Sequence, residues 1–159
     1  MRFCLLIEYN GSAYYGWQIQ NGQVTIQGEI ENALNQIYSQ KIGIVGAGRT
    51  DTGVHARGQV AHFDIDLPID PGKLLRSLNG ILNSDIRIKS VLPADPEFHA
   101  RYSALSREYH YYIAPHPIVI FGEYVWHLTY KLSLKRMNKA VEYIRGRHDF
   151  KSFCRAKSD

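Results

Sequence analysis

The chain has 159 residues, enough for one domain of ordinary size and too few for two. Apolar residues make up 45% of the sequence and charged residues 21%, which is typical of globular proteins and excludes a disordered chain. The formal net charge is +4 and the pI is about 9.1, so a nucleic-acid partner is compatible with the charge but not required by it.

The cysteines and the apolar runs predict a cytoplasmic location. Cys4 and Cys154 are far apart and fit no metal-ligand spacing, so we expect free thiols in a reducing compartment. No apolar run reaches the ~20 residues of a membrane-spanning helix. The apolar run over 3–7 is interrupted at once by Tyr9 and Asn10, which argues against a signal peptide.

The first part of the chain predicts four strands and two helices in the order β-α-β-β-α-β. The predicted strands cover 3–9, 42–45, 59–65 and 86–91, and the predicted helices cover 25–38 and 70–82. Thr25 can cap the first helix, and Asp70 followed by Pro71 is typical of a helix start. This order predicts an α+β fold, a ferredoxin-like unit with an antiparallel sheet whose open face often binds RNA.

The pattern restarts after Pro93. A strand is predicted over 108–114, and a helix over 133–145 carries Leu134, Met137, Val141 and Ile144 on one side. We therefore predict an N-terminal ferredoxin-like catalytic half over 1–93. The region 94–159 would be the start of an incomplete C-terminal half of the same type.

The loop over 46–56, with the sequence GAGRTDTGVHA, is the most informative segment. It places one carboxylate, Asp51, between two predicted strands, with Arg49 two residues before it and His55 four after. Asp51 can serve as a nucleophile or general base, or it can be a turn aspartate that caps its own backbone. Arg49 can keep Asp51 ionised and meet a phosphate, or it can be a surface ion-pair partner.

Other chemistries fit the sequence less well. A metal-dependent phosphohydrolase would use Asp51, His55 and His62, but this spacing matches no metal signature, and we expect His62 to be a satisfied strand residue. Gly43, Gly46 and Gly48 do not follow the dinucleotide-binding pattern, and a strand rather than a helix follows them.

Two aromatic segments admit both a structural and a binding role. The loop over 10–18 contains three aromatic residues that can stack on bases or, as we favour, cover an edge of the core. In the predicted strand after residue 107, Tyr109 and Tyr111 share one face, and His110 and Tyr112 share the other. One of these faces should belong to the core, and the other can present a ring to a base. Arg101 and Arg107 can bind phosphate or remain solvated.

Seven segments together resemble the tRNA pseudouridine synthase A family over nearly the whole chain. They are EYNGSAYYGWQ (8–18), TIQGEIENAL (25–34), GAGRTDTGVHA (46–56), GQVAHF (58–63), FHARYSA (98–104), REYHYYI (107–113) and GRHDFKSF (146–153). The string GRTD-x-GVHA is highly specific, and its occurrence with the others in this order makes a chance match negligible.

The resemblance implies a function and a role for three residues. Asp51 would be the nucleophile that converts uridine to pseudouridine, Tyr109 would pack on the target base, and Arg49 would fill the gap left by the flipped nucleotide and orient Asp51. The substrate would be the anticodon stem-loop of tRNA, at positions 38 to 40. The family works as a homodimer without a cofactor or metal.

Family members extend beyond the segment over 146–153. The part that follows holds a V-R-N-type segment, whose basic residue contacts the catalytic aspartate, and the strands that complete the second half. We therefore expect weak or absent activity from this chain alone and marginal stability in its last ~50 residues. The alternative is a non-catalytic tRNA-binding remnant.

Overall fold

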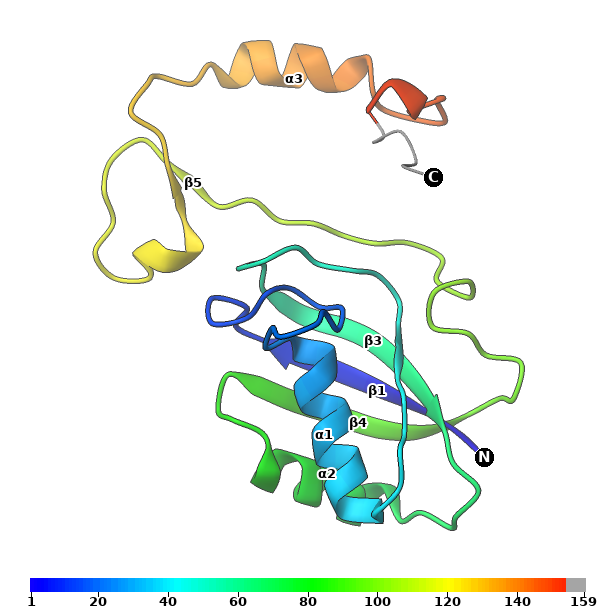
Figure 1. Ribbon diagram of the computed structural model, residues 1–159. Coiled ribbons are helices and arrows are strands. Elements are labelled where there is room, and N and C mark those ends of the chain that lie inside the picture. Colours follow the sequence, from blue (N-terminus) through cyan, green and yellow to red (C-terminus); the bar gives the residue numbers. More distant parts are fainter. Residues whose placement is uncertain (154–159) are drawn as a thin grey trace. The chain divides into compact units, whose positions relative to one another are not determined.

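The computed structural model describes residues 1–153. The chain divides into two compact units (Figure 1). The first unit is Met1–Arg107, and the second begins at Glu108. Within residues 1–153, no helix is long and apolar enough to cross a membrane.

A four-stranded antiparallel sheet forms the base of the first unit. Its strands are β1 (Arg2–Tyr9), β2 (Val45–Gly46), β3 (Ala56–Asp64) and β4 (Ile86–Ala94), in the spatial order β2-β3-β1-β4. Leu5 in the central strand β1 pairs with Ala61 on one side and Val91 on the other. The predicted mixed fold with an antiparallel sheet is confirmed.

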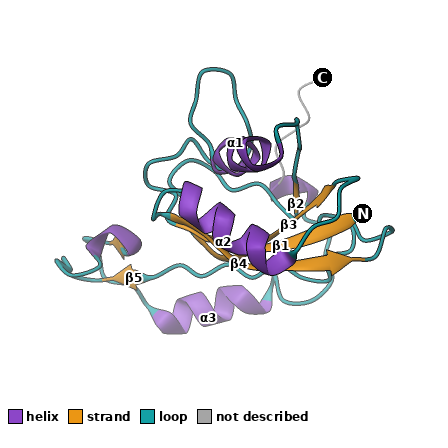
Figure 2. Cartoon of the chain, turned by 90° about the horizontal axis from the view of Figure 1, so that it is seen from below, coloured by secondary structure: helices purple, strands orange, loops and turns teal. Residues whose placement is uncertain are grey.

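Helices α1 (Ile26–Tyr38) and α2 (Pro71–Ile81) lie on one face of this sheet (Figure 2). Both predicted caps are confirmed. The Thr25 hydroxyl accepts a hydrogen bond from the Gly28 amide at 3.2 Å, and the Asp70 carboxylate accepts from two amides of the first turn of α2. Each cap satisfies amide groups that a helix start leaves without partners.

The core lies between the two helices and the sheet. Alternate residues of β1 face it, and apolar residues of both helices meet them at helical spacing. The fully buried ones include Leu5, Ile7, Ile26, Ile30, Leu34, Leu74 and Leu78. Cys4, on the opposite face of β1, is a half-buried free thiol whose pKa is raised by burial. Cys154 lies outside the described residues.

The predicted strand over 42–45 is wrong in extent, since only Val45–Gly46 pair with β3. Ile42 and Ile44 are buried, but their amides bond to side chains of α1 instead of a neighbouring strand. The Ile42 amide donates to Asn35 Oδ1 at 2.6 Å, and the Ile44 amide donates to Glu31 Oε1 at 2.9 Å. Helix side chains thus take the place of a β-ladder here.

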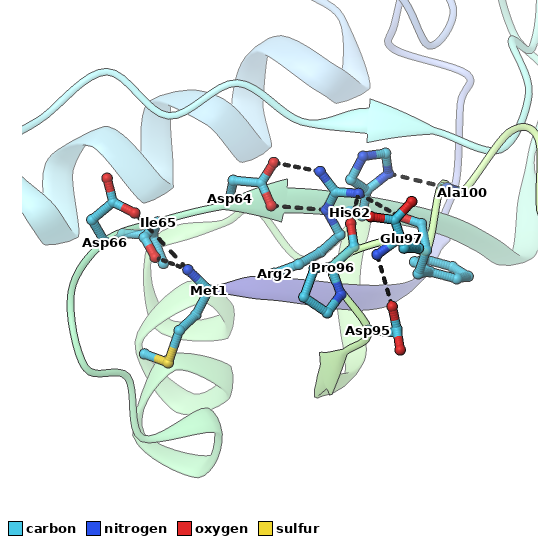
Figure 3. Close-up of polar contacts among 11 residues, drawn as sticks. Met1, Arg2, His62, Asp64, Ile65, Asp66, Asp95, Pro96, Glu97 and Ala100 are labelled. Carbon is cyan, nitrogen blue, oxygen red and sulfur yellow. Dashed lines mark hydrogen bonds and ion pairs between the residues drawn. The ribbon is translucent and has the colours of Figure 1, made fainter.

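The segment after β4 covers one end of the sheet face that lies away from the helices (Figure 3). His62 on this face is only 4% exposed, and its Nδ1 accepts a hydrogen bond from the Ala100 amide at 3.1 Å. Arg2 pairs with Asp64 at 2.7 Å and donates to two carbonyl groups of the covering segment. His62 is therefore the satisfied strand residue that we expected, and this end of the face is not open.

The second unit contains little regular structure. Its elements are β5 (Ile113–Ala114), the 3-10 helix η1 (Gly122–Tyr124), β6 (Trp126–His127), α3 (Leu134–Glu142) and the 3-10 helix η2 (Lys151–Phe153). The predicted strand over 108–114 forms only at its last two residues, because its parallel partner β6 is also two residues long. The predicted helix over 133–145 forms as the shorter α3, which ends at Glu142, and the Ser133 hydroxyl caps it.

Candidate active site

The loop over 47–55 connects β2 to β3 and carries Asp51 near its middle. Its first arm is fixed to β3 by two hydrogen bonds. The Ala47 amide donates to the Val60 carbonyl at 2.7 Å, and Gln59 Nε2 donates to the Gly48 carbonyl at 2.7 Å. The approach to Asp51 is thereby held by the sheet.

The residues beside Asp51 are held by a second loop, which follows β1. The Trp17 amide donates to the Thr50 carbonyl at 3.0 Å, and the Thr50 hydroxyl pairs with the hydroxyl of Tyr9, the last residue of β1, at 2.8 Å. The Gly53 amide donates to the Tyr14 carbonyl at 3.4 Å. Since these bonds lie on both sides of Asp51, the two loops together fix the backbone that carries its side chain.

Glycines allow the two loops to approach this closely. Gly16 has φ +81°, which favours glycine, and a Cβ there would lie 2.5 Å from the Thr50 carbonyl oxygen. A Cβ on Gly46 would lie 2.7 Å from the Trp17 ring. The glycines quoted from the two segments are therefore needed to bring the backbones together.

The aromatic residues of the loop over 10–18 have divided roles. Tyr14 and Trp17 are buried, which confirms the favoured core role for these two residues. Burial, together with a 2.6 Å hydrogen bond from the Tyr14 hydroxyl to Asp85, raises the pKa of Tyr14 to about 12. Tyr15 is 51% exposed and lies on the same side as Asp51.

Asp51 lines an open surface hollow of about 570 Å³. The other lining residues are Tyr15, Gln18, Ile19, Gln20, Arg49, Thr50 and Thr52. Asp51 and Arg49 are both exposed and share this hollow. Within residues 1–153, however, no ion pair joins them.

The carboxylate of Asp51 is not a turn cap. The turn is closed by the backbone, through a 3.2 Å hydrogen bond from the Val54 amide to the Asp51 carbonyl. Among the hydrogen bonds of the described residues, none engages the Asp51 carboxylate with its own loop, whereas the carboxylates of Asp70 and Asp95 do cap nearby amides. The Asp51 carboxylate is therefore available to a ligand.

The structure does not assemble the metal site that we considered. His55 Nδ1 accepts a hydrogen bond from the Gly11 amide at 3.2 Å, and His62 Nδ1 accepts from the Ala100 amide. The described part of the chain contains no group of three possible ligands placed to hold a metal ion. The described residues therefore do not bring Asp51, His55 and His62 together as ligands of one metal ion.

Tyr109 lies in the second unit, so the structure does not place it relative to Asp51. Its side chain is 67% exposed, and it is not part of a strand. Arg107, at the end of the first unit, contacts the first arm of the Asp51 loop through hydrogen bonds to the Ala47 carbonyl. The sequence assigned Arg107 only to phosphate or solvent and did not predict this contact.

Comparison with known proteins identifies the family. The family model described as tRNA pseudouridine synthase matches residues 5–103, a range that includes Asp51 and Arg49 but not Tyr109. The chain therefore belongs to the tRNA pseudouridine synthase family.

Individual relatives carry the same name. The chain is 46% identical over 156 residues to tRNA pseudouridine synthase A of Geobacillus sp. (strain WCH70), covering 96% of this chain and 63% of that protein. It is 42% identical over 163 residues to tRNA pseudouridine synthase A of Bacillus subtilis (strain 168), covering 100% of this chain and 66% of the relative. The chain thus spans slightly less than two thirds of the length of these relatives.

Proposed function

We propose that this chain carries the catalytic loop of an enzyme that isomerises uridine to pseudouridine in the anticodon stem-loop of tRNA, at positions 38 to 40. The observation that carries the proposal is the position of the Asp51 carboxylate, which is exposed in a hollow and does not cap its own turn. The backbones of neighbouring residues on both sides of Asp51 are held by hydrogen bonds. The family assignment and the names of the relatives support tRNA as the substrate class.

The reaction conserves all atoms of the nucleoside. The bond between N1 and C1′ breaks, a bond between C5 and C1′ forms, the proton on C5 leaves, and N1 takes up a proton. A carboxylate can add to C1′ or to the ring, or it can assist departure of the base. Every route needs a deprotonated carboxylate that faces the nucleoside, which is the role proposed for Asp51. The balance calls for no oxidant, reductant or cofactor.

Arg49 and Tyr109 have supporting roles in this proposal. An enzyme that acts on a paired or stacked base must first extrude it, which leaves a gap in the helix. The guanidinium of Arg49, on the rim of the same hollow, can fill that gap or pair with a phosphate. The exposed ring of Tyr109 can stack on the extruded base.

The proposal extends to the architecture and assembly. The order of elements and strands in the first unit matches that expected of a ferredoxin-like unit, and we assign 1–93 to an N-terminal catalytic half. The region 94–159 is assigned to the start of a C-terminal half, although residues 94–107 cluster with the first compact unit. We further propose a cytoplasmic homodimer, and weak turnover when the chain is assayed alone.

The test compares Asp51→Asn with Asp66→Asn, a matched change at an exposed carboxylate outside the hollow. Each protein is incubated with tRNA, and the nucleosides are separated by chromatography after digestion. We expect Asp51→Asn to lose the product that the unchanged protein forms, while keeping its affinity for tRNA, because a nucleophile acts on the chemical step. Asp66→Asn should match the unchanged protein.

Two results would contradict the proposal. Product formed equally by Asp51→Asn and the unchanged protein would remove Asp51 from the chemistry. No product from either protein, even with the chain in excess over tRNA so that weak turnover would be detected, and with tRNA affinity intact, would favour the non-catalytic tRNA-binding module.

A further inference from the structure

We propose that Arg107 is a positioning residue for the Asp51 loop, an inference that rests on the proposed function. Arg107 Nε and Nη2 both donate to the Ala47 carbonyl, at 3.1 and 2.7 Å. Nη2 also donates to the Arg101 carbonyl at 2.9 Å. The guanidinium therefore ties the first arm of the loop to the segment that follows the sheet.

This contact complements the one made by Gln59. Gln59 holds the Gly48 carbonyl from β3, while Arg107 holds the preceding carbonyl, that of Ala47. The consecutive carbonyl groups of Ala47 and Gly48 thus each accept a hydrogen bond from a side chain in a different part of the fold. The amide of Ala47 is bonded to Val60 as well, so the arm is fixed only a few residues before Asp51.

The glycine at position 48 in the first arm of the loop leaves room for the guanidinium of Arg107 beside it. A Cβ on Gly48 would lie 3.5 Å from Arg107 Nε and 3.8 Å from its Cδ, so Arg107 packs along this glycine. The planar fork of arginine can serve two carbonyls at once, whereas the point charge of lysine cannot reproduce that geometry. Shape as well as charge is therefore required at position 107.

The consequence for the reaction follows from the location of the contact. Arg107 is placed on the backbone of the loop and not on the wall of the hollow that contains Asp51. Removing it should let the loop move, and small displacements of a reacting group lower the rate strongly. The effect should fall on the chemical step and not on affinity for tRNA.

The first experiment measures amide hydrogen exchange by NMR in Arg107→Ala, Arg107→Lys and Arg76→Ala. Arg76 is an exposed arginine on α2, so its removal matches the loss of charge. We expect Arg107→Ala to raise exchange at Ala47, Gly53 and Val54 about tenfold, with unchanged exchange in β1. The exchange rates of these loop amides in Arg107→Lys should lie between those of Arg107→Ala and the unchanged chain. The rates in Arg76→Ala should match those of the unchanged chain. Unaltered loop exchange in Arg107→Ala would overturn the proposal.

The second experiment measures the single-turnover rate and the affinity for tRNA. We expect Arg107→Ala to lower the rate at saturating tRNA about tenfold, with unchanged affinity and partial rescue by lysine. A lower affinity with an unchanged rate at saturation would instead make Arg107 an RNA contact and overturn the proposal. Failure of the proposed function would show separately, as no effect of Asp51→Asn, while the exchange experiment still decides whether Arg107 holds the loop.

Discussion

His62 shows how a single strand residue ties a later segment to the sheet. Its ring accepts a hydrogen bond from the Ala100 amide through Nδ1, which requires this nitrogen to be unprotonated. Burial lowers the pKa of His62 below its usual 6.5, and electrostatic interactions with Arg2 and His99 lower it further, against a smaller opposing effect of Asp64. The neutral ring is therefore the form that the fold requires.

The stability of the first unit should consequently depend on pH. Because the pKa of His62 is lower in the folded state, the unfolded chain takes up the proton first as the pH falls below about 6.5. The contribution of His62 is then fully present above that pH and is lost progressively below it. Urea denaturation at pH 7.5 and 5.5 should show this loss. It should be smaller in His62→Asn, which cannot titrate but keeps an acceptor.

An exposed histidine of the second unit, His116, provides the matched control. His116→Asn should leave the pH dependence of the free energy of unfolding as it is in the unchanged chain. Equal pH dependence in His62→Asn and the unchanged chain would refute the assignment.

At the scale of elements, the segment over 42–45 shows which part of a strand prediction the sequence supports. The strand predicted over 42–45 is consistent with the burial of Ile42 and Ile44. The prediction did not indicate where their amides find partners, because Asn35 and Glu31 belong to a helix earlier in the chain. Burial follows from local pattern, whereas hydrogen-bond partners depend on the fold.

The same distinction applies to the site. The caps at Thr25 and Asp70, and the placement of Asp51 on a glycine-rich loop between strands, follow from local sequence. The contact between Arg107 and Ala47 joins residues 60 positions apart, and no local pattern reports it. The strand expected over 108–114 failed for a related reason, since its length depends on a partner that is only two residues long.

Replacing Asn35 tests whether helix side chains support the segment after α1. In Asn35→Ala, the Ile42 amide loses its acceptor, and leaving a buried donor unsatisfied costs about 1–3 kcal/mol. We expect the free energy of unfolding, measured by urea denaturation, to fall by that amount. Asn32→Ala, an exposed change on the same helix, should alter it by less than about 0.5 kcal/mol. Equal effects of the two changes would contradict this role of Asn35.

At the scale of the whole molecule, buried apolar residues are distributed very unevenly. The hydrophobic core cluster lies entirely in the first unit. Among the described residues of the second unit, only Ala114 and Leu128 are buried. Since burial of apolar surface is the main source of stability, the two units should differ widely in resistance to local opening.

Amide exchange in helix α3 can be used to measure how the two units differ in resistance to local opening. The helix has nine residues, none of them buried, and Leu134 and Val141 on its apolar side are 72% and 49% exposed. A helix this short is marginal in water without packing, whereas α1 buries Ile26, Ile30 and Leu34 completely. We therefore expect amide exchange in α3 to be at least about 10²-fold faster than in α1.

The exchange measurement should be repeated over a series of protein concentrations. If a second copy covers the apolar side of α3, its protection will rise with concentration, while protection in α1 stays constant. If the chain stays uncovered, α3 will exchange fast at every concentration. Protection of α3 equal to that of α1 in dilute solution would contradict the prediction, because it would require packing that the described residues do not supply.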